Sequence, residues 1–237
     1  YGINHVIGHV AVTQLQFGDL PANTMALIVS GGHTSLLHVN DIARDVEVVG
    51  TTLDDAAGEC FDKVARLLGF PYPGGPYIDR HAQHGDPHAI KVPQGLTQGR
   101  AGKEHPYDFS FSGLKTAVIN LLHNAAQKGV QVSIPDLAAS YRQAVVDCLT
   151  RNFVHAAEAT GARKLVLAGG VSANTLLRRR MQELCRQNGW QLFMPQLSLC
   201  GDNAAMVGAQ AYFEQQAGHF AGMALNARPT MSIEAGF

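Results

Sequence analysis

The sequence predicts an α/β domain in which helices cover both faces of one mixed sheet. Three apolar runs in hairpin succession lie in the first part of the chain, and an alternation of strand, helix, strand and helix follows later. Antiparallel strands followed by such an alternation are typical of this architecture. The 237 residues are 46% hydrophobic and 16% charged, which is enough apolar material to bury a large core.

The first elements are a short helix and a meander of strands. Asn4 is a candidate cap for a helix within 1–20, because apolar residues then recur at helical spacing. After this helix the period changes to short apolar runs separated by turns. This change predicts strands over 25–30, 34–39 and 45–51.

Helices and an irregular segment follow the meander. Thr52 with Asp55 fits a capping box, and helical spacing continues until Gly69 ends the helix. The segment 71–106 is rich in Pro, Gly and His and shows no sustained period, so we expect an irregular surface excursion of the length that functional loops have. A helix over 112–128 comes next.

The last part of the chain alternates between strand and helix. Pro135 begins a long helix at its first turn. The elements expected after it are strands over 164–168 and 191–194 and helices over 173–188 and 202–216. Together with the meander, this order indicates an α/β layout of the ribonuclease H and actin type.

Composition narrows the class of function. The formal net charge is −1, and the basic residues are spread out except for the run Arg178-Arg179-Arg180. Composition therefore gives no electrostatic case for a nucleic-acid binder, and we expect any RNA contact to be local or shared with a partner.

Cysteine spacing and hydropathy favour a soluble cytoplasmic protein. No CxxC pair is present, which argues against a zinc ribbon, a redox pair or a disulfide framework. The cysteines, expected to be buried thiols, are Cys60, Cys148, Cys185 and Cys200. We also find no apolar run of membrane-spanning length and no leader pattern.

His5 and His9 are candidate metal ligands, because residues four apart on a helix project from one face. Two unrelated histidines are the alternative, since the chain has 11 histidines. Val6 stands where zinc peptidases of the HExxH type carry their glutamate base, which disfavours peptidase chemistry. Asp202 is the best candidate for a third ligand because it ends a loop where a helix begins; a helix-capping aspartate is the alternative.

Glycine turns are candidate nucleotide contacts. One turn, Ser30-Gly31-Gly32-His33-Thr34, joins two strands, and a second over 169–174 joins a strand to a helix. Paired glycines let backbone amides approach an anion, and two such turns in one domain favour a nucleotide over ordinary turn chemistry. Asp62 and Asp79 flank a third turn over 72–76, either as acceptors for ribose hydroxyls or as solvated helix charges.

Taken together, these motifs resemble those of the TsaD family, the tRNA N6-adenosine threonylcarbamoyltransferases. The motifs are HVIGH at 5–9, VSGGHT at 29–34, DAAGE at 55–59, FDK at 61–63, YPGGP at 72–76, DFSFSGLKT at 108–116, GGVSAN at 169–174 and DN at 202–203. The resemblance implies an actin-like ATPase (ASKHA) fold. It also implies transfer of a threonylcarbamoyl group from threonylcarbamoyl-AMP to N6 of the adenosine 3′ of the anticodon, in tRNAs that read ANN codons.

The resemblance also implies roles for single residues. The implied metal ligands are His5, His9 and Asp202, which would bind Fe²⁺, or alternatively Zn²⁺, with one ion per subunit. The implied substrate-binding residues are Ile28, Val29, Ser30, Gly31, Gly32, Asp62, Gly75, Asp79 and Asn174. The implied partners are tRNA, a nucleotide, and proteins of the TsaB and TsaE type. No residue stands out as a general base, and His33 is a weak candidate.

The chain departs from the family in its first domain, whose opening strands and acidic hairpin have no counterpart before Tyr1. We therefore expect a remnant of the first domain over 1–24, a second domain over 25–217 with an inserted substrate loop at about 71–106, and a tail over 218–237 that packs on the first domain. If the protein begins at Tyr1, we expect an exposed apolar surface on the histidine-bearing helix and little or no activity.

Two other classes of function stay open. A non-catalytic scaffold of the TsaB kind shares the fold, but it has no need of a metal site. An actin-like kinase or ATPase would use the same glycine turns for ATP and Mg²⁺, whereas two histidine ligands suit iron or zinc better.

Overall fold

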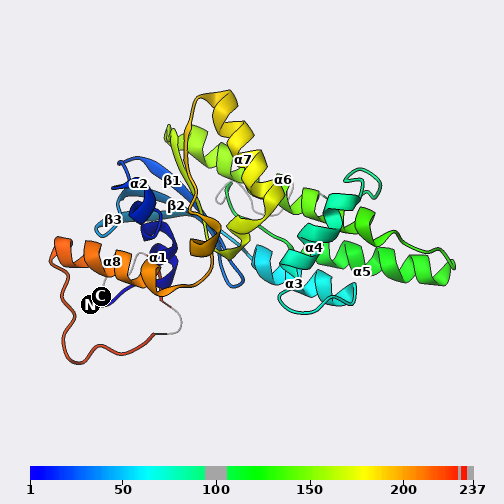
Figure 1. Cartoon of the computed structure of the whole chain (residues 1–237), viewed down its shortest axis with the longest axis horizontal. Helices are drawn as coiled ribbons and strands as arrows, with labels where there is room; N and C mark the ends of the chain where they lie inside the picture. The colour runs from blue at the N-terminus through cyan, green and yellow to red at the C-terminus, as the bar shows by residue number, and fades with distance from the viewer. Residues whose placement is uncertain (94–105, 229–230, 234–237) are drawn as a thin grey trace.

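A mixed five-stranded sheet forms the centre of the molecule, with the strand order β3-β2-β1-β4-β5 (Figure 1). The computed structural model describes residues 1–93, 106–228 and 231–233. Its strands are β1 (Thr24–Val29), β2 (Thr34–Asp41), β3 (Asp45–Thr51), β4 (Lys164–Ala168) and β5 (Gln191–Phe193). Because β1 pairs antiparallel with β2 and parallel with β4, the predicted mixed sheet is confirmed.

Helices cover both faces of this sheet. They are α1 (His5–Ala11), α2 (Gln14–Phe17), α3 (Ala57–Leu67), α4 (Gly75–His81), α5 (Ser112–Gln127), α6 (Ile134–Thr160), α7 (Thr175–Asn188) and α8 (Ala204–Ala217). Successive β1 side chains point to opposite faces. Leu27 therefore packs in the core with α3, α5, α6 and α7, and Ile28 packs in the core with α1 and α8. Figure 1 shows α1 and α8 side by side, with α3, α4 and α5 extending away on the other side.

The segment 71–106 is more regular than the sequence indicates. It contains α4 and a 3-10 turn, η1 (Ala82–His84), so the expectation of an irregular excursion was wrong for these residues. Residues 94–105 lie outside the described part of the chain. Pro76 sits in the first turn of α4, where its missing N–H costs no hydrogen bond. The glycines and prolines here begin a helix.

The start of α3 also differs from the prediction. Its N-cap is Ala56, which has no side-chain acceptor, and the Ala57 amide instead donates to the Thr34 hydroxyl at 2.9 Å, so the capping box of Thr52 with Asp55 was wrong. The Thr52 hydroxyl instead donates to the Asp55 carbonyl at 3.0 Å. The predicted end is confirmed, because Gly69 follows the helix with a φ of +79°, a left-handed conformation that glycine adopts without strain.

The histidine-bearing helix α1 buries its apolar side chains. Val6, Ile7 and Val10 are at most 7% exposed and pack in the core that α1 shares with the sheet and α8. The expected exposed apolar surface is therefore absent from α1, although Leu15 and Phe17, in the part of the predicted helix that forms α2, are exposed. The tail returns to the same region, because the Tyr1 and Phe220 rings lie 5.5 Å apart. Within the described residues, no helix combines the length and apolar character that a membrane span needs.

Candidate metal centre and nucleotide cavity

Helix α1 places His5 and His9 on one face, one turn apart. The N-cap residue of the helix is Asn4, whose side-chain oxygen accepts from the backbone amides of Val6 at 3.0 Å and Ile7 at 3.4 Å, so the predicted cap is confirmed. The two imidazole rings lie 5.1 Å apart. The His9 side chain is 1% exposed, whereas the His5 side chain is half exposed. The pair therefore points from a buried position toward a surface opening.

Asp202 completes a cluster of three metal-ligand side chains. Its carboxylate oxygen Oδ1 lies 3.3 Å from His5 Nε2 and 3.2 Å from His9 Nε2. One ligand atom from each residue lies within 4.8 Å of the other two. The N-cap of α8 is Asn203, whose side chain accepts from the Met206 amide at 2.9 Å. The alternative reading of Asp202 as that cap was wrong, and its carboxylate is available to a ligand.

The cluster fits a metal ion in its chemistry. Within the described residues, neither ring nitrogen of the buried His9 makes a hydrogen bond of normal geometry; Nε2 faces the Asp202 carboxylate oxygen at 3.2 Å, and Nδ1 has no hydrogen-bond partner, although buried polar atoms normally have one. Burial, and then the neighbouring His5, lower the pKa of His9, which keeps the ring neutral and its lone pair available. Two imidazoles and a carboxylate suit iron or zinc better than magnesium.

A cavity of about 620 Å³ lies between α3, α4 and the turn η2 (Gly170–Ala173). Among the residues that line it are five of the predicted substrate-binding residues, Gly31, Asp62, Gly75, Asp79 and Asn174. Phe61, Tyr72, Pro73 and Pro76 form the apolar part of the wall; the sequence analysis placed them in motifs but gave them no binding role. An apolar wall with a few polar groups is what a nucleoside-sized ligand needs.

Four other predicted substrate residues do not line this cavity. Ile28 and Val29 are buried in β1, and their side chains pack in the two cores. Ser30 and Gly32 belong to the turn after β1, in which the Ser30 amide donates to the His33 carbonyl at 2.8 Å. These four roles stay predictions.

The polar residues of the cavity also hold its walls together. Asp62 accepts from the Gly74 amide at 2.7 Å and so fixes the start of α4 on α3. Asp79 accepts from the Arg142 guanidinium at 2.8 Å and from the Thr175 hydroxyl at 3.1 Å, which ties α4 to α6 and α7. These long-range bonds rule out the alternative of a solvated helix charge for Asp79, because its side chain is 14% exposed.

The turn after β1 lies between the metal-ligand cluster and the cavity. Gly31 lines the cavity, while the His33 ring, two residues further on, lies 6.2 Å from the His5 ring. Helix α3 contacts this turn closely, because a Cβ on Gly58 would lie 2.4 Å from the Ser30 carbonyl oxygen. A ligand seated in the cavity can therefore extend past Gly31 toward the histidines.

The part of the chain that carries the motifs, the sheet and the cavity matches a known protein family. The family model for "TsaD: tRNA N6-adenosine threonylcarbamoyltransferase" matches residues 1–209, which covers α1, the sheet and the cavity. The chain belongs to the TsaD family. This membership confirms the resemblance inferred from the sequence motifs.

Curated relatives carry the same family description. The chain is 62% identical over 207 residues to a tRNA N6-adenosine threonylcarbamoyltransferase of Bifidobacterium adolescentis, covering 87% of this chain and 60% of the relative. It is 45% identical over 232 residues to one of Moorella thermoacetica, covering 98% of this chain and 66% of the relative. The chain thus spans roughly three fifths to two thirds of the length of these relatives.

A solved structure of HypF in a phosphate- and nucleotide-bound form is similar in fold. Its TM-score is 0.68 at 14% sequence identity, over 92% of this chain and 36% of HypF. At this identity the likeness concerns the fold, and the predicted actin-like α/β class is confirmed. The TsaD chain therefore carries its family's sequence motifs on the expected mixed sheet.

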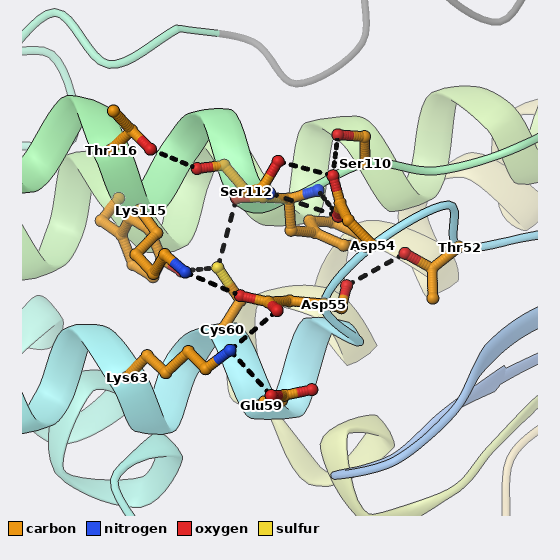
Figure 2. A network of polar contacts seen from close by, with 12 residues as sticks. Thr52, Asp54, Asp55, Glu59, Cys60, Lys63, Ser110, Ser112, Lys115 and Thr116 are labelled. Carbon is orange, nitrogen blue, oxygen red and sulfur yellow. Dashed lines mark hydrogen bonds and ion pairs between the residues drawn. The ribbon is translucent and has the colours of Figure 1, made fainter.

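Figure 2 shows a polar network that joins α3 to α5 in this TsaD family member. Asp54 accepts from the Phe111 amide at 2.8 Å and from the Ser112 hydroxyl at 2.6 Å, and it also accepts from the Ser110 hydroxyl. Asp54 therefore caps α5 from a distant part of the chain. Beside it, Asp55 accepts from Lys63 at 2.7 Å and from Lys115 at 3.2 Å. The network fixes α5 against the helix that forms one wall of the cavity.

Replacing Asp54 with alanine should lower the free energy of unfolding by about 1 to 2 kcal/mol, because the start of α5 loses its cap. Urea unfolding measures the change, and Asp19→Ala, at an exposed loop aspartate, is the matched control.

Burial raises the pKa of Asp54, but the four hydrogen bonds outweigh it and hold the pKa below the ordinary 3.8. The contribution should therefore be complete above pH 3.8 and disappear as pH falls through the lowered pKa. Equal stability of both variants would contradict this capping role.

The four cysteines are buried, as the sequence predicts, and none forms a disulfide. Burial raises the pKa of the Cys60 thiol to about 11, and burial has the same effect on Cys148 and Cys185. Thiols with such pKa values are poor nucleophiles near neutral pH. Cys60, Cys148 and Cys185 are therefore poor candidates for a catalytic nucleophile.

Proposed function

We propose that this chain carries the metal-binding and nucleotide-binding part of a tRNA N6-adenosine threonylcarbamoyltransferase that acts in the cytoplasm. It would transfer the threonylcarbamoyl group of threonylcarbamoyl-AMP to N6 of the adenosine 3′ of the anticodon, in tRNAs that read ANN codons. The observation that carries the proposal is the meeting of His5, His9 and Asp202 beside a nucleoside-sized cavity, in a chain that belongs to the TsaD family.

Residues of this chain would bind the donor and position its acyl portion. The nucleoside of the donor would occupy the cavity between Asp62, Asp79 and Asn174. The turn at Gly31 would carry its phosphate and acyl portion toward the histidines. An adenine amine is a poor nucleophile, so the mixed anhydride of the donor has to be held in a reactive orientation. This chain would supply that orientation through rigid, hydrogen-bonded walls.

A metal ion would be held by His5, His9 and Asp202, and we propose Fe²⁺ or alternatively Zn²⁺. When bound, it supplies a Lewis acid that stabilises negative charge on an oxygen of the acyl donor. The formal charge of −1 gives the chain little general attraction for RNA. We therefore propose that tRNA is held partly by TsaB-type and TsaE-type partner proteins.

Transfer of a labelled threonylcarbamoyl group to unmodified tRNA tests this function, with the protein that carries this chain and its partner proteins supplied. Replacing His9 with alanine should remove bound iron or zinc and reduce transfer to background, because the buried imidazole is one of three ligands. Replacing the exposed His123 with alanine is the matched control and should change neither metal content nor transfer.

Other results would favour the two competing classes. A protein that contains no iron or zinc and hydrolyses ATP with Mg²⁺ would support an actin-like kinase or ATPase. A protein that retains its metal in the His9→Ala variant, or that supports transfer only by a partner enzyme, would contradict the proposed role of this cluster.

A further inference from the structure

Arg178 differs from the two arginines that follow it in the basic run. The Arg179 side chain is 69% exposed, and its nearest carboxylate, on Glu183, lies 4.0 Å away. Arg178 is partly buried, and its guanidinium donates to backbone carbonyls of two separate segments. The first residue of the basic run therefore has an internal role.

The two segments that Arg178 joins belong to the two halves of the site. Its Nη1 donates to the Ser172 carbonyl at 3.3 Å, and Ser172 lies in η2, which forms a wall of the cavity. Its Nη2 donates to the Pro195 carbonyl at 3.1 Å, at the start of the segment that leads to Asp202. A planar guanidinium holds two carbonyls in a fixed relation because its donors lie in one rigid fork, whereas the donors of an ammonium rotate.

Arg178 also contacts the second segment close to Asp202, the residue that supplies the metal-ligand carboxylate. Arg178 Nη1 also lies 3.7 Å from the sulfur of Cys200, two residues before Asp202. The Cys200 side chain is buried, and its thiol lies 3.5 Å from the Gln196 carbonyl oxygen. The turn that follows is compact, because the Asn203 side chain donates to the Gly201 carbonyl at 2.8 Å. A shift at Pro195 or Cys200 would therefore move Asp202 relative to the histidines.

We propose that Arg178 is a positioning residue that couples the metal-ligand cluster to the nucleoside cavity. It holds the segment bearing Asp202 on the turn that lines the cavity, so that occupation of one site favours the geometry of the other. The inference rests on the proposed function of both sites. Coupling of this kind is reciprocal, since each ligand changes the affinity of the other by the same factor.

Replacing Arg178 with methionine, which keeps an apolar stem, tests the coupling through binding. Zn²⁺ affinity, measured by competition with a chelator, should fall about tenfold, at the lower end of the range for residues that orient metal ligands. Calorimetric titration with AMP, with and without Zn²⁺, should show weaker AMP binding and loss of the enhancement that each ligand gives the other. Arg178→Lys should recover part of the Zn²⁺ affinity, because an ammonium can still bond one carbonyl. Arg179→Met is the matched control and should behave as wild type.

A readout without any ligand separates this inference from the proposed function. The amides of Leu199 and Cys200 donate within the segment that leads to Asp202, and in Arg178→Met they should exchange with solvent faster. Unchanged Zn²⁺ and AMP affinities and unchanged coupling in Arg178→Met, whether or not the melting temperature falls, would overturn the inference alone. The same loss in Arg179→Met would also overturn it, because that result indicates an effect of charge. A wild-type protein that binds neither Zn²⁺ nor AMP would overturn the proposed function and this inference with it.

Discussion

Gly169→Ala should lower the free energy of unfolding by about 3 kcal/mol, because two costs combine at this position. Gly169 has a φ of +89°, a conformation that strains any residue with a Cβ. A Cβ there would also lie 2.4 Å from the carbonyl oxygen of Val29, the last residue of β1. Neither atom belongs to a flexible side chain, so relief requires a shift of β1 or of the turn after β4.

Gly170 provides the matched control for this prediction. It has no unusual φ, and a Cβ added to it would meet nothing within 4 Å. Gly170→Ala should therefore change the free energy of unfolding by at most about 0.5 kcal/mol. Urea unfolding of the two variants gives the comparison. Similar losses for both would mean that the close approach to Val29 does not constrain this turn.

The strands could be predicted because each is a short apolar run that a turn interrupts. The predicted ranges of β3 (Asp45–Thr51) and β4 (Lys164–Ala168) agree with the structure at both ends. Helix starts were harder, because a cap can come from elsewhere in the chain. Asp54 precedes α3 but caps α5, and nothing local in the sequence distinguishes these two roles. Hydrogen bonds between distant parts of the chain determine which helix Asp54 caps.

In the candidate site, too, some features follow from local sequence spacing, and others depend on residues far apart in the chain. The spacing of His5 and His9 predicts a shared helix face, and the structure places both rings there. The competition between Asp202 and Asn203 for the cap of α8 could not be settled from the sequence, because both residue types are good caps. The bond between Arg142 and Asp79 spans 63 positions, and no spacing rule indicates it.

Removing the Asp202 carboxylate should weaken metal binding by at least about a hundredfold, since even residues that only orient metal ligands change affinity by 10- to 100-fold. The side chain is 73% exposed, so Asp202→Ala should leave the stability of the metal-free protein nearly unchanged. Asn203→Ala should have the opposite pattern, with a loss of stability and no loss of metal affinity. It removes the cap of α8 and should cost about 1 kcal/mol of stability, while the three ligands stay in place.

Thermal unfolding with and without Zn²⁺ separates these two effects. At a Zn²⁺ concentration of about 100 times the wild-type dissociation constant, binding should stabilise the wild-type protein by about 2.7 kcal/mol. A hundredfold loss of affinity reduces that gain to about 0.4 kcal/mol in Asp202→Ala. Asn203→Ala should unfold earlier than wild type yet keep most of the gain, because its ligands are intact. If Asp202→Ala kept the full gain from Zn²⁺, the cluster of His5, His9 and Asp202 could not be the metal site, and the ion would be bound elsewhere.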